Sequence, residues 1–226
     1  MQIVTMIDTI GTDAHNIPAG TARVAGYITG TGGVRWSAGD WRPFPTADRV
    51  LIDQSPMFTR LSLDADVVDA EPHAAAPASV VDWVRGRIAA RMTWSVIYGT
   101  AATLLAVRAA MESADPPGWW HGHVRAWLAN WDLDQEEAAK IIGAQEAGMT
   151  CVAVQWASPA SNPRTLVPDG NGATLAEANL DLSVCDASWR PGLDLPVPVL
   201  SRPGYLVTGQ YSGRPVSSAD GGKTWS

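Results

Sequence analysis

The stretch ADVVDAEPH, residues 65–73, places two carboxylates at the end of a short apolar run. Val67 and Val68 are typical of a strand that is buried on both faces. Asp69 and Glu71 are two positions apart, so in an extended chain their side chains point to the same side, with Cα atoms about 6.5 Å apart. The stretch therefore predicts a buried strand whose end presents two acids to one face.

Similar apolar runs recur along the chain, and helical spacing of apolar residues appears between several of them. We expect eight strands, at residues 3–9, 23–29, 49–54, 65–71, 93–99, 124–130, 150–157 and 180–186. We expect helices at residues 77–91, 100–112 and 134–148. Helices after the first three strands are not evident.

This alternation predicts an α/β fold, and eight strands favour a compact, irregular TIM-like β/α barrel. The alternative is a doubly wound open sheet. Residues 158–174 form a polar connection with Pro and Gly and no evident helix, so we expect the final strand to be antiparallel.

We expect the barrel to occupy residues 1–190. The composition then becomes Pro-rich over residues 191–203. The last residues include SADGGKTW (218–225), which resembles the Asp-box hairpin of β-propeller sialidases. Residues 191–226 are therefore predicted to be a linker and a small C-terminal β extension.

The composition excludes several classes of protein. Of the 226 residues, 46% are hydrophobic, which indicates a globular chain with a core. The net charge of −7 argues against nucleic acid or an anionic membrane as the main partner, since both attract basic surfaces. The N-terminus lacks a charged segment followed by a long apolar one, so we expect no signal peptide and no membrane span.

The two cysteines do not make a disulfide framework. If the last two strands pair with Gln155 opposite Asp181, then Cys151 falls opposite Cys185, because each cysteine lies four residues away on its strand. We therefore expect the two cysteines to lie close together, as buried thiols.

Further acids lie at strand ends. Asp8 ends the first expected strand, Asp53 ends the third, and Asp181 begins the last. Barrel active sites form at the carboxyl ends of the strands, and an antiparallel last strand would begin at that same mouth. Glycosidases need one carboxylic acid to protonate the leaving oxygen and one carboxylate to face the developing cation. An isolated D-x-E is more often a solvated turn, but converging acids favour a site.

The chain resembles the glycoside hydrolase family 25 lysozymes in the order of six motifs over roughly residues 3–190. They are MID (6–8), VDAE (68–71), VIYG (96–99), AWLANW (126–131), VAVQWAS (152–158) and LDLSV (180–184). The family has an Asp on the first strand, a D-x-E on the fourth, a Tyr after the fifth, a W-x-A-x-[YW] on the sixth, a Q-[YW] on the seventh and a D-L-N near the end.

The resemblance implies roles for individual residues. Glu71 would be the general acid/base, and Asp69 would orient the substrate or stabilise charge. Asp8 and Asp181 would complete an acidic floor. The further substrate-binding residues that we expect are Tyr98, Trp127, Gln155, Asp53 and Tyr27. We expect no cofactor and no metal, and we interpret His121 and His123 as part of a surface turn.

Two functions follow as hypotheses. The first is a muramidase-like glycoside hydrolase that cleaves bacterial cell-wall peptidoglycan, as a phage lysin or a virion-associated enzyme. The second is a non-catalytic tail or capsid protein that binds glycan. GYITGTGG (26–33) lacks the lysine and acid of the family's K-A-T-E-G stretch, which favours the second. In either case the expected partners are cell-wall glycan and other virion proteins, with no nucleic acid and no membrane. The expected location is a phage virion or an infected cell, acting at the wall.

Overall fold

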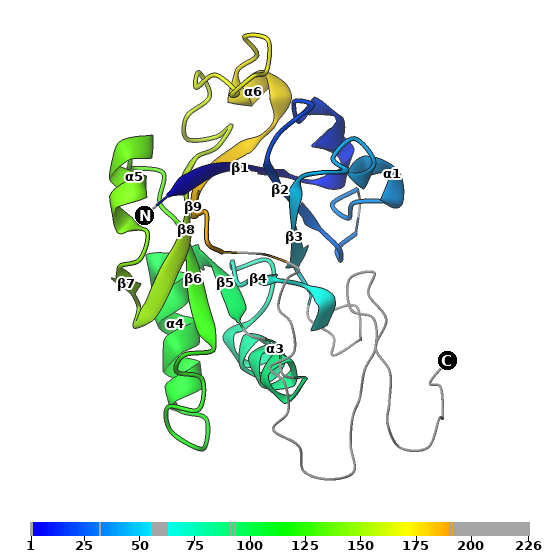
Figure 1. The fold of residues 1–226 in the computed structure, drawn as a ribbon. Coiled ribbons are helices and arrows are strands. Elements are labelled where there is room, and N and C mark those ends of the chain that lie inside the picture. Colours follow the sequence, from blue (N-terminus) through cyan, green and yellow to red (C-terminus); the bar gives the residue numbers. More distant parts are fainter. Residues whose placement is uncertain are drawn as a thin grey trace, which may run out of the picture.

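The computed structural model describes residues 2–31, 33–55, 63–90, 92, 94–189 and 191. Its main feature is a closed barrel of eight strands with helices around it (Figure 1). The barrel strands are β1 (Ile3–Thr9), β2 (Arg23–Tyr27), β3 (Asp48–Asp53), β4 (Val67–Asp69), β5 (Ser95–Thr100), β6 (Val124–Ala129), β8 (Met149–Ala157) and β9 (Asp181–Asp186). The short β7 (Gln145–Glu146) pairs with β8 outside the ring.

The pairing of the strands confirms the predicted barrel. Strands β1 to β6 are parallel neighbours in chain order, and β8 continues the ring parallel to β6. Strand β9 closes the ring and is antiparallel to both β8 and β1, as predicted. The alternative of an open doubly wound sheet is therefore wrong. The β8–β9 connection contains one short helix, α6 (Leu175–Ala178), which the sequence analysis did not predict.

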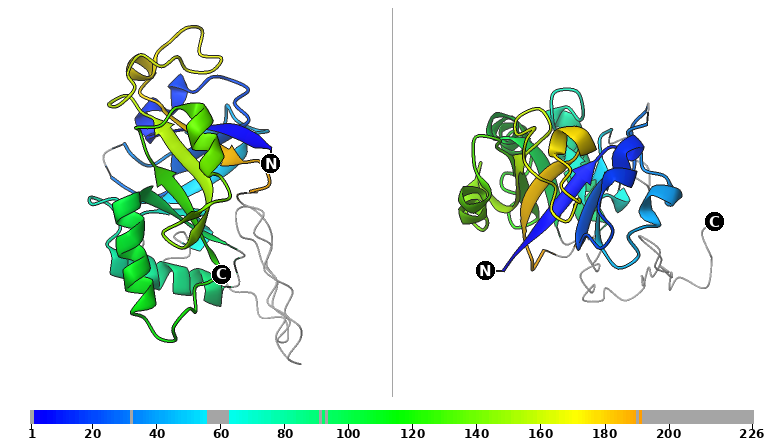
Figure 2. Two further views of the ribbon diagram at one scale, coloured as in Figure 1. Left: turned by 90° about the vertical axis from the view of Figure 1, so that its left-hand side faces the viewer. Right: turned by 90° about the horizontal axis from the view of Figure 1, so that it is seen from above.

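Three longer helices lie outside the barrel, as the views in Figures 1 and 2 show. Helix α3 (Pro77–Ala89) and helix α4 (Ala101–Glu112) match their predicted ranges closely and contact each other. Helix α5 (Gln135–Ile141) is shorter than predicted, because the chain turns at Gly143, whose φ is +86°, and enters β7. In the described residues between β1 and β3, the connections contain a 3₁₀ helix, η1 (Gly11–Asn16), and the four-residue α1 (Ala38–Trp41).

Alternation along the strands separates two apolar layers. The inner layer fills the barrel with Met6, Ala25, Val50, Ile52, Val67, Val96, Tyr98, Trp127, Ala129, Val152, Ala153, Cys185 and Trp189. The outer layer joins the barrel wall to the helices and includes Trp83, Val84, Leu104 and Val107. Asp8 on β1, Asp69 on β4 and Asp181 on β9 lie an even number of positions from inner-layer residues of the same strands. Their side chains therefore point to the inner face of the barrel.

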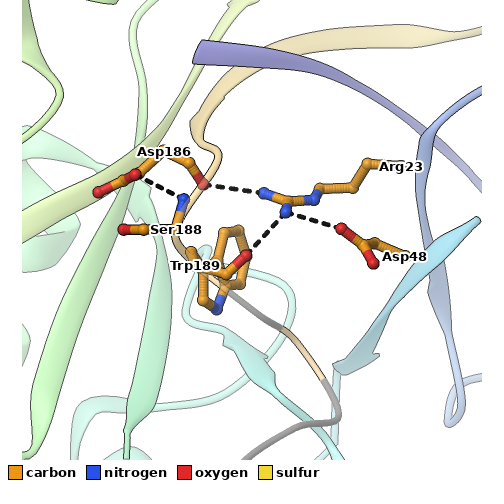
Figure 3. A network of polar contacts seen from close by, with 5 residues as sticks. All are labelled: Arg23, Asp48, Asp186, Ser188 and Trp189. Carbon is orange, nitrogen blue, oxygen red and sulfur yellow. Dashed lines mark hydrogen bonds and ion pairs between the residues drawn. The ribbon is translucent and has the colours of Figure 1, made fainter. Parts of the chain in front are cut away.

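The amino-terminal end of the barrel is closed by a network around Arg23, which is only 1% exposed (Figure 3). Its guanidinium donates to Asp48 Oδ2 at 2.9 Å and to the carbonyl oxygens of Asp186 and Trp189 at 3.1 and 2.7 Å. The Trp189 ring lies 5.6 Å from Arg23 Cζ. The segment that follows β9 is therefore part of the barrel up to Trp189.

Two details of the predicted register are wrong. Gln155 pairs with Ser183 instead of Asp181, and Ala153 pairs with Cys185. An irregularity in β8 places both Val152 and Ala153 on the inner layer. As a result Cys151 belongs to the outer layer and Cys185 to the inner one, so the two free thiols lie on opposite faces of the barrel wall.

The predicted linker and β extension at residues 191–226 lie outside the described residues, apart from residue 191. Within the described ranges, no helix combines the length and apolar character that crossing a membrane requires.

Candidate active site at the carboxyl end of the barrel

The carboxyl ends of the parallel strands and the start of β9 meet at one mouth of the barrel. Asp8 pairs directly with Asp181 across β1 and β9. On the other side, Asp69 pairs with Tyr98, and Tyr98 pairs with Trp127. Mutual electrostatic effects link Asp8 with Asp69, Glu71 and Asp181. The structure therefore brings together four of the five acids that the sequence analysis expected at this mouth.

Asp69 and Glu71 are held together by a turn. Strand β4 ends at Asp69, so the expected continuation of the strand to residue 71 is wrong. The backbone N–H of Glu71 donates to Asp69 Oδ1 at 3.0 Å, and the Tyr27 hydroxyl donates to Asp69 Oδ2 at 3.3 Å. Asp69 is buried, whereas Glu71 is partly exposed. The turn thus holds the Asp69 carboxylate in place in the interior and leaves Glu71 partly accessible to solvent.

Electrostatics favour proton retention at both groups. Burial raises the pKa of Glu71, and the charge of Asp69 raises it further. Against these effects, a hydrogen bond with Tyr98 and the nearby His73 lower the pKa of Glu71. Burial also raises the pKa of Asp69, while the donors from the Glu71 backbone and from Tyr27 lower it. The donors on Asp69 stabilise its anion, as expected for the partner of a proton donor.

Asp8, which is buried, and Asp181, which is partly exposed, form a carboxyl pair. Burial, followed by the charge of Asp181, raises the pKa of Asp8 well above its ordinary value. Asp8 Oδ1 is buried and has no hydrogen-bond partner. Burial raises the pKa of Asp181 to about 7, while a hydrogen bond from Gln155 lowers it. Two adjacent buried carboxyls avoid carrying two charges, so this pair holds a proton near neutral pH.

Two tyrosines supply hydroxyl groups to the acids. Burial raises the pKa of Tyr27 and of Tyr98 well above the usual value, and the neighbouring acids raise both further. Both hydroxyls therefore remain protonated over the range in which the carboxyls titrate. The Tyr98 hydroxyl donates a hydrogen bond to Gln155 Oε1.

Trp127 and Gln155 lie below the acids and not on an exposed surface. Trp127 is 1% exposed, stacks edge-on against Tyr98 with ring centroids 4.8 Å apart, and donates to Ser183 Oγ at 3.1 Å. Gln155 is 2% exposed. Both residues therefore support the site from inside the barrel, and their contact with substrate stays a prediction.

Asp53 does not join the acids, although it ends β3. Ile52 belongs to the inner layer, so Asp53 lies on the opposite face of its strand. Its Oδ1 accepts hydrogen bonds from the Thr29 hydroxyl at 2.6 Å and from the Ser55 backbone at 2.9 Å. The structure therefore does not bring Asp53 to the other acids, and its contacts fix the turn after β3.

The sequence analysis missed one aromatic residue near this mouth. Trp131 follows the end of β6, packs against the inner layer and is partly exposed. The sequence signal that could have indicated Trp131 is its position four residues after Trp127. A partly exposed tryptophan is a side chain of the kind that sugars stack on.

In the described part of the chain, no group of three or more His, Cys, Asp or Glu side chains is arranged to hold a metal ion. The chemistry that the site residues offer is proton transfer and charge stabilisation by carboxyl groups.

Comparison with known proteins gives the fold alone. No family model matches the chain, and no curated protein matches it in sequence. The crystal structure of an uncharacterized B. stearothermophilus protein is similar, with a TM-score of 0.51 and 10% sequence identity over 81% of this chain and 96% of that chain. Its fold therefore supports the barrel architecture and does not bear on activity.

Proposed function

We propose that this protein is a glycoside hydrolase that cleaves bacterial cell-wall peptidoglycan in the manner of an N-acetylmuramidase. The observation that carries the proposal is the turn that joins Asp69 to Glu71 among the acids of the barrel mouth. A glycosidase needs a retained proton beside a stabilised anion, and these two residues meet that need. The six sequence motifs that resemble family 25 lysozymes suggest the substrate.

In this proposal Glu71 protonates the glycosidic oxygen of the leaving sugar. Its pKa is raised by burial and by Asp69, which favours the protonated form that a general acid requires. Asp69 faces the positive charge that develops on the sugar ring, and the donors from Tyr27 and from the Glu71 backbone favour its ionised form against the opposing effect of burial. The setting that we propose is a phage particle or an infected cell, with cell-wall glycan and other virion proteins as partners.

The test is release of reducing ends from purified peptidoglycan by the full chain. We expect activity in the wild type, and a loss of about 10²–10⁴-fold in Glu71→Gln, which keeps the shape and removes the proton. Asp69→Asn should also reduce turnover strongly. A matched control is Glu112→Gln, which alters an exposed acid at the end of helix α4 that lies toward the opposite end of the barrel, and should leave turnover unchanged.

A non-catalytic glycan-binding protein of the virion is the second candidate. It is favoured by the raised pKa of Asp69, whose first cause is burial, because a protonated Asp69 could not stabilise a cation. Neutral carboxyl groups would still hydrogen-bond sugar hydroxyls. Peptidoglycan pull-down separates the two: binding without any release of reducing ends would support this candidate and reject the enzyme.

A further inference from the structure

A second pair of acids lies at the barrel mouth, apart from the pair that the proposed reaction uses. Asp8 and Asp181 are directly opposite each other across β1 and β9, an arrangement in which the two Cα atoms are about 4.5–5.5 Å apart. Both side chains point to the inner face, because each lies an even number of positions from an inner-layer residue of its strand. The proposed function assigns no chemical role to this pair.

The Asp8 carboxyl lacks the hydrogen-bond donor that a buried carboxylate needs. Asp8 is only 5% exposed, and within the part of the chain that the structure describes its Oδ1 accepts no hydrogen bond. The ion pairs found among those residues do not involve Asp8 or Asp181. The charges that act on Asp8 are those of other acids, namely Asp181, Asp69 and Glu71. A ligand that brings both a donor and a positive charge would offset the cost of burying this carboxylate.

Asp181 makes the pair reachable from the mouth. It is partly exposed at the start of β9, whereas Asp8 is buried beside it. A positive group that touches Asp181 also attracts the Asp8 carboxylate, because Coulomb energy is large between close groups with little water between them. Asp69 and Glu71 border the same mouth from the end of β4 and the turn after it. A glycan in contact with Glu71 can thus bring a ring substituent to Asp181.

The chemistry of the pair favours an ammonium group over the other substituents of a glycan. An ammonium carries a positive charge and three N–H donors, so it can neutralise and hydrogen-bond two carboxylates together. A hydroxyl or an acetamide donates one hydrogen and carries no charge. A divalent metal ion fits less well, because in the described ranges no three His, Cys, Asp or Glu side chains are arranged to hold one.

We propose that Asp8 and Asp181 form a subsite for the ammonium group of an unacetylated amino sugar, with Asp181 in contact with the ligand and Asp8 adding negative charge behind it. The proposal rests on the proposed function in taking cell-wall glycan as the ligand, and it narrows the substrate class to glycan that carries free amino groups. Burial and mutual repulsion, which raise the pKa of Asp8, also make the pair retain a proton when no cation is bound. A bound ammonium would favour the ionised form of both acids.

The test compares three linear tetrasaccharides, of β-linked glucosamine, N-acetylglucosamine and glucose. They differ only in the substituent beside the anomeric carbon, which is an amine, an acetamide or a hydroxyl. Isothermal titration calorimetry at pH 7 measures their affinities for the full chain carrying Glu71→Gln, so that cleavage does not interfere. We expect the glucosamine oligomer to bind roughly tenfold more tightly than either of the others. Added salt should reduce this preference.

Variants of the pair locate the preference. Asp181→Asn, added to Glu71→Gln, keeps the shape of the side chain and removes its charge, so the preference should fall to about twofold or less. Asp8→Asn should reduce the preference in part, and it carries the test if Asp181→Asn does not fold. Asp186→Asn is the matched control, because this partly exposed acid lies at the other end of β9, opposite Ile3. It removes the same charge from the protein but not from the mouth, and should leave the preference unchanged.

Equal affinities for the three oligomers, or tighter binding of the acetamide or hydroxyl form, would overturn the proposal. So would a preference that survives both Asp181→Asn and Asp8→Asn, or one that Asp186→Asn reduces equally, since the attraction would then be to the overall charge. Failure of this subsite is distinct from failure of the proposed function, because the binding measurement needs no cleavage. A chain that releases reducing ends without preferring the amine keeps the function and loses the subsite, and an inactive chain with the preference keeps the subsite.

Discussion

Asp8 and Asp181 are opposite one another across the antiparallel pair of β1 and β9, both on the inner face of the barrel. Burial is the largest cause of the raised pKa of each acid, and the negative charge of Asp181 raises the pKa of Asp8 further. In the described residues Asp8 Oδ1 has no hydrogen-bond donor. The two acids are thus positioned at a cost to the stability of the fold, as is common where a site needs buried charge.

This cost should depend on pH. The unfolded-state pKa of an aspartate is about 3.9, and that of Asp181 in the folded state is about 7. Between these values the folded state binds more protons than the unfolded state. The free energy of unfolding therefore falls as pH rises through this window, and the stabilising effect of protonation is fully present only below it.

Asp8→Asn should accordingly raise the free energy of unfolding at pH 8 by roughly 1–3 kcal/mol, because it removes an unpaired buried carboxylate. Near pH 4 the gain should largely vanish, since Asp8 is then protonated in the wild type. Urea unfolding at the two pH values measures both. Asp48→Asn is the opposite control, because it removes the negative charge that pairs with the buried Arg23 and should destabilise at pH 8. A loss of stability in Asp8→Asn at pH 8 would contradict the prediction.

The two tryptophans near the mouth should behave differently. Trp127→Phe removes the indole donor to Ser183 and should lower stability by roughly 1 kcal/mol, with glycan affinity unchanged once the folded fraction is equal. Trp131→Ala should weaken glycan binding by roughly two- to tenfold. Fluorescence titration with soluble peptidoglycan fragments measures both affinities. Equal losses of affinity in the two variants would show that Trp131 has no contact of its own with glycan.

The cysteines should not form an intramolecular disulfide. They lie on opposite layers of the barrel wall, and burial is the first cause that raises the pKa of each to about 12. We expect reaction with a chromogenic disulfide reagent at pH 8 to be slow in the native protein and fast in denaturant. Mass spectrometry after mild oxidation should show two free thiols. A bonded native monomer would mean that the irregularity at Val152 is absent in solution.

The barrel could be predicted from the sequence because its strands are short apolar runs and its acids lie at their ends. Asp8, Asp69 and Asp181 share the inner face because each is an even number of positions from an inner-layer residue of its strand. Asp53 looks alike in the sequence but lies an odd number of positions from Ile52. The acids differ in the face of the strand on which they lie, and the residue type alone does not reveal that face.

The pairing of β8 with β9 could not be predicted in the same way. The β8–β9 ladder shifts register between Gln155 and Ala157, and an extra residue near Val152 in the β6–β8 ladder changes which side chains of β8 point inward. Apolar residues on both faces leave no alternation in the sequence to reveal either irregularity. The position of Glu71 in a turn was also not evident from the sequence. Asp69 accepts the Glu71 backbone N–H and ends the strand early, a local interaction that Asp forms readily in turns.

The last prediction concerns where the barrel ends. Arg23 binds the backbone carbonyls of Asp186 and Trp189, and the Trp189 side chain is 3% exposed against the inner layer (Figure 3). A chain that ends after residue 191 keeps all of these contacts. We expect it to unfold cooperatively with a free energy within about 0.5 kcal/mol of that of the full chain.

A chain that ends after Asp186 should behave otherwise. It loses the Trp189 side chain, and Arg23 is left buried without one of its carbonyl partners. We expect a loss of about 3–5 kcal/mol, which Trp189→Ala in the full chain should largely reproduce. Urea unfolding followed by circular dichroism compares the four proteins. If the chain ending at residue 191 is insoluble or unfolds without cooperativity, residues beyond it belong to the folded barrel and the boundary near residue 190 is wrong.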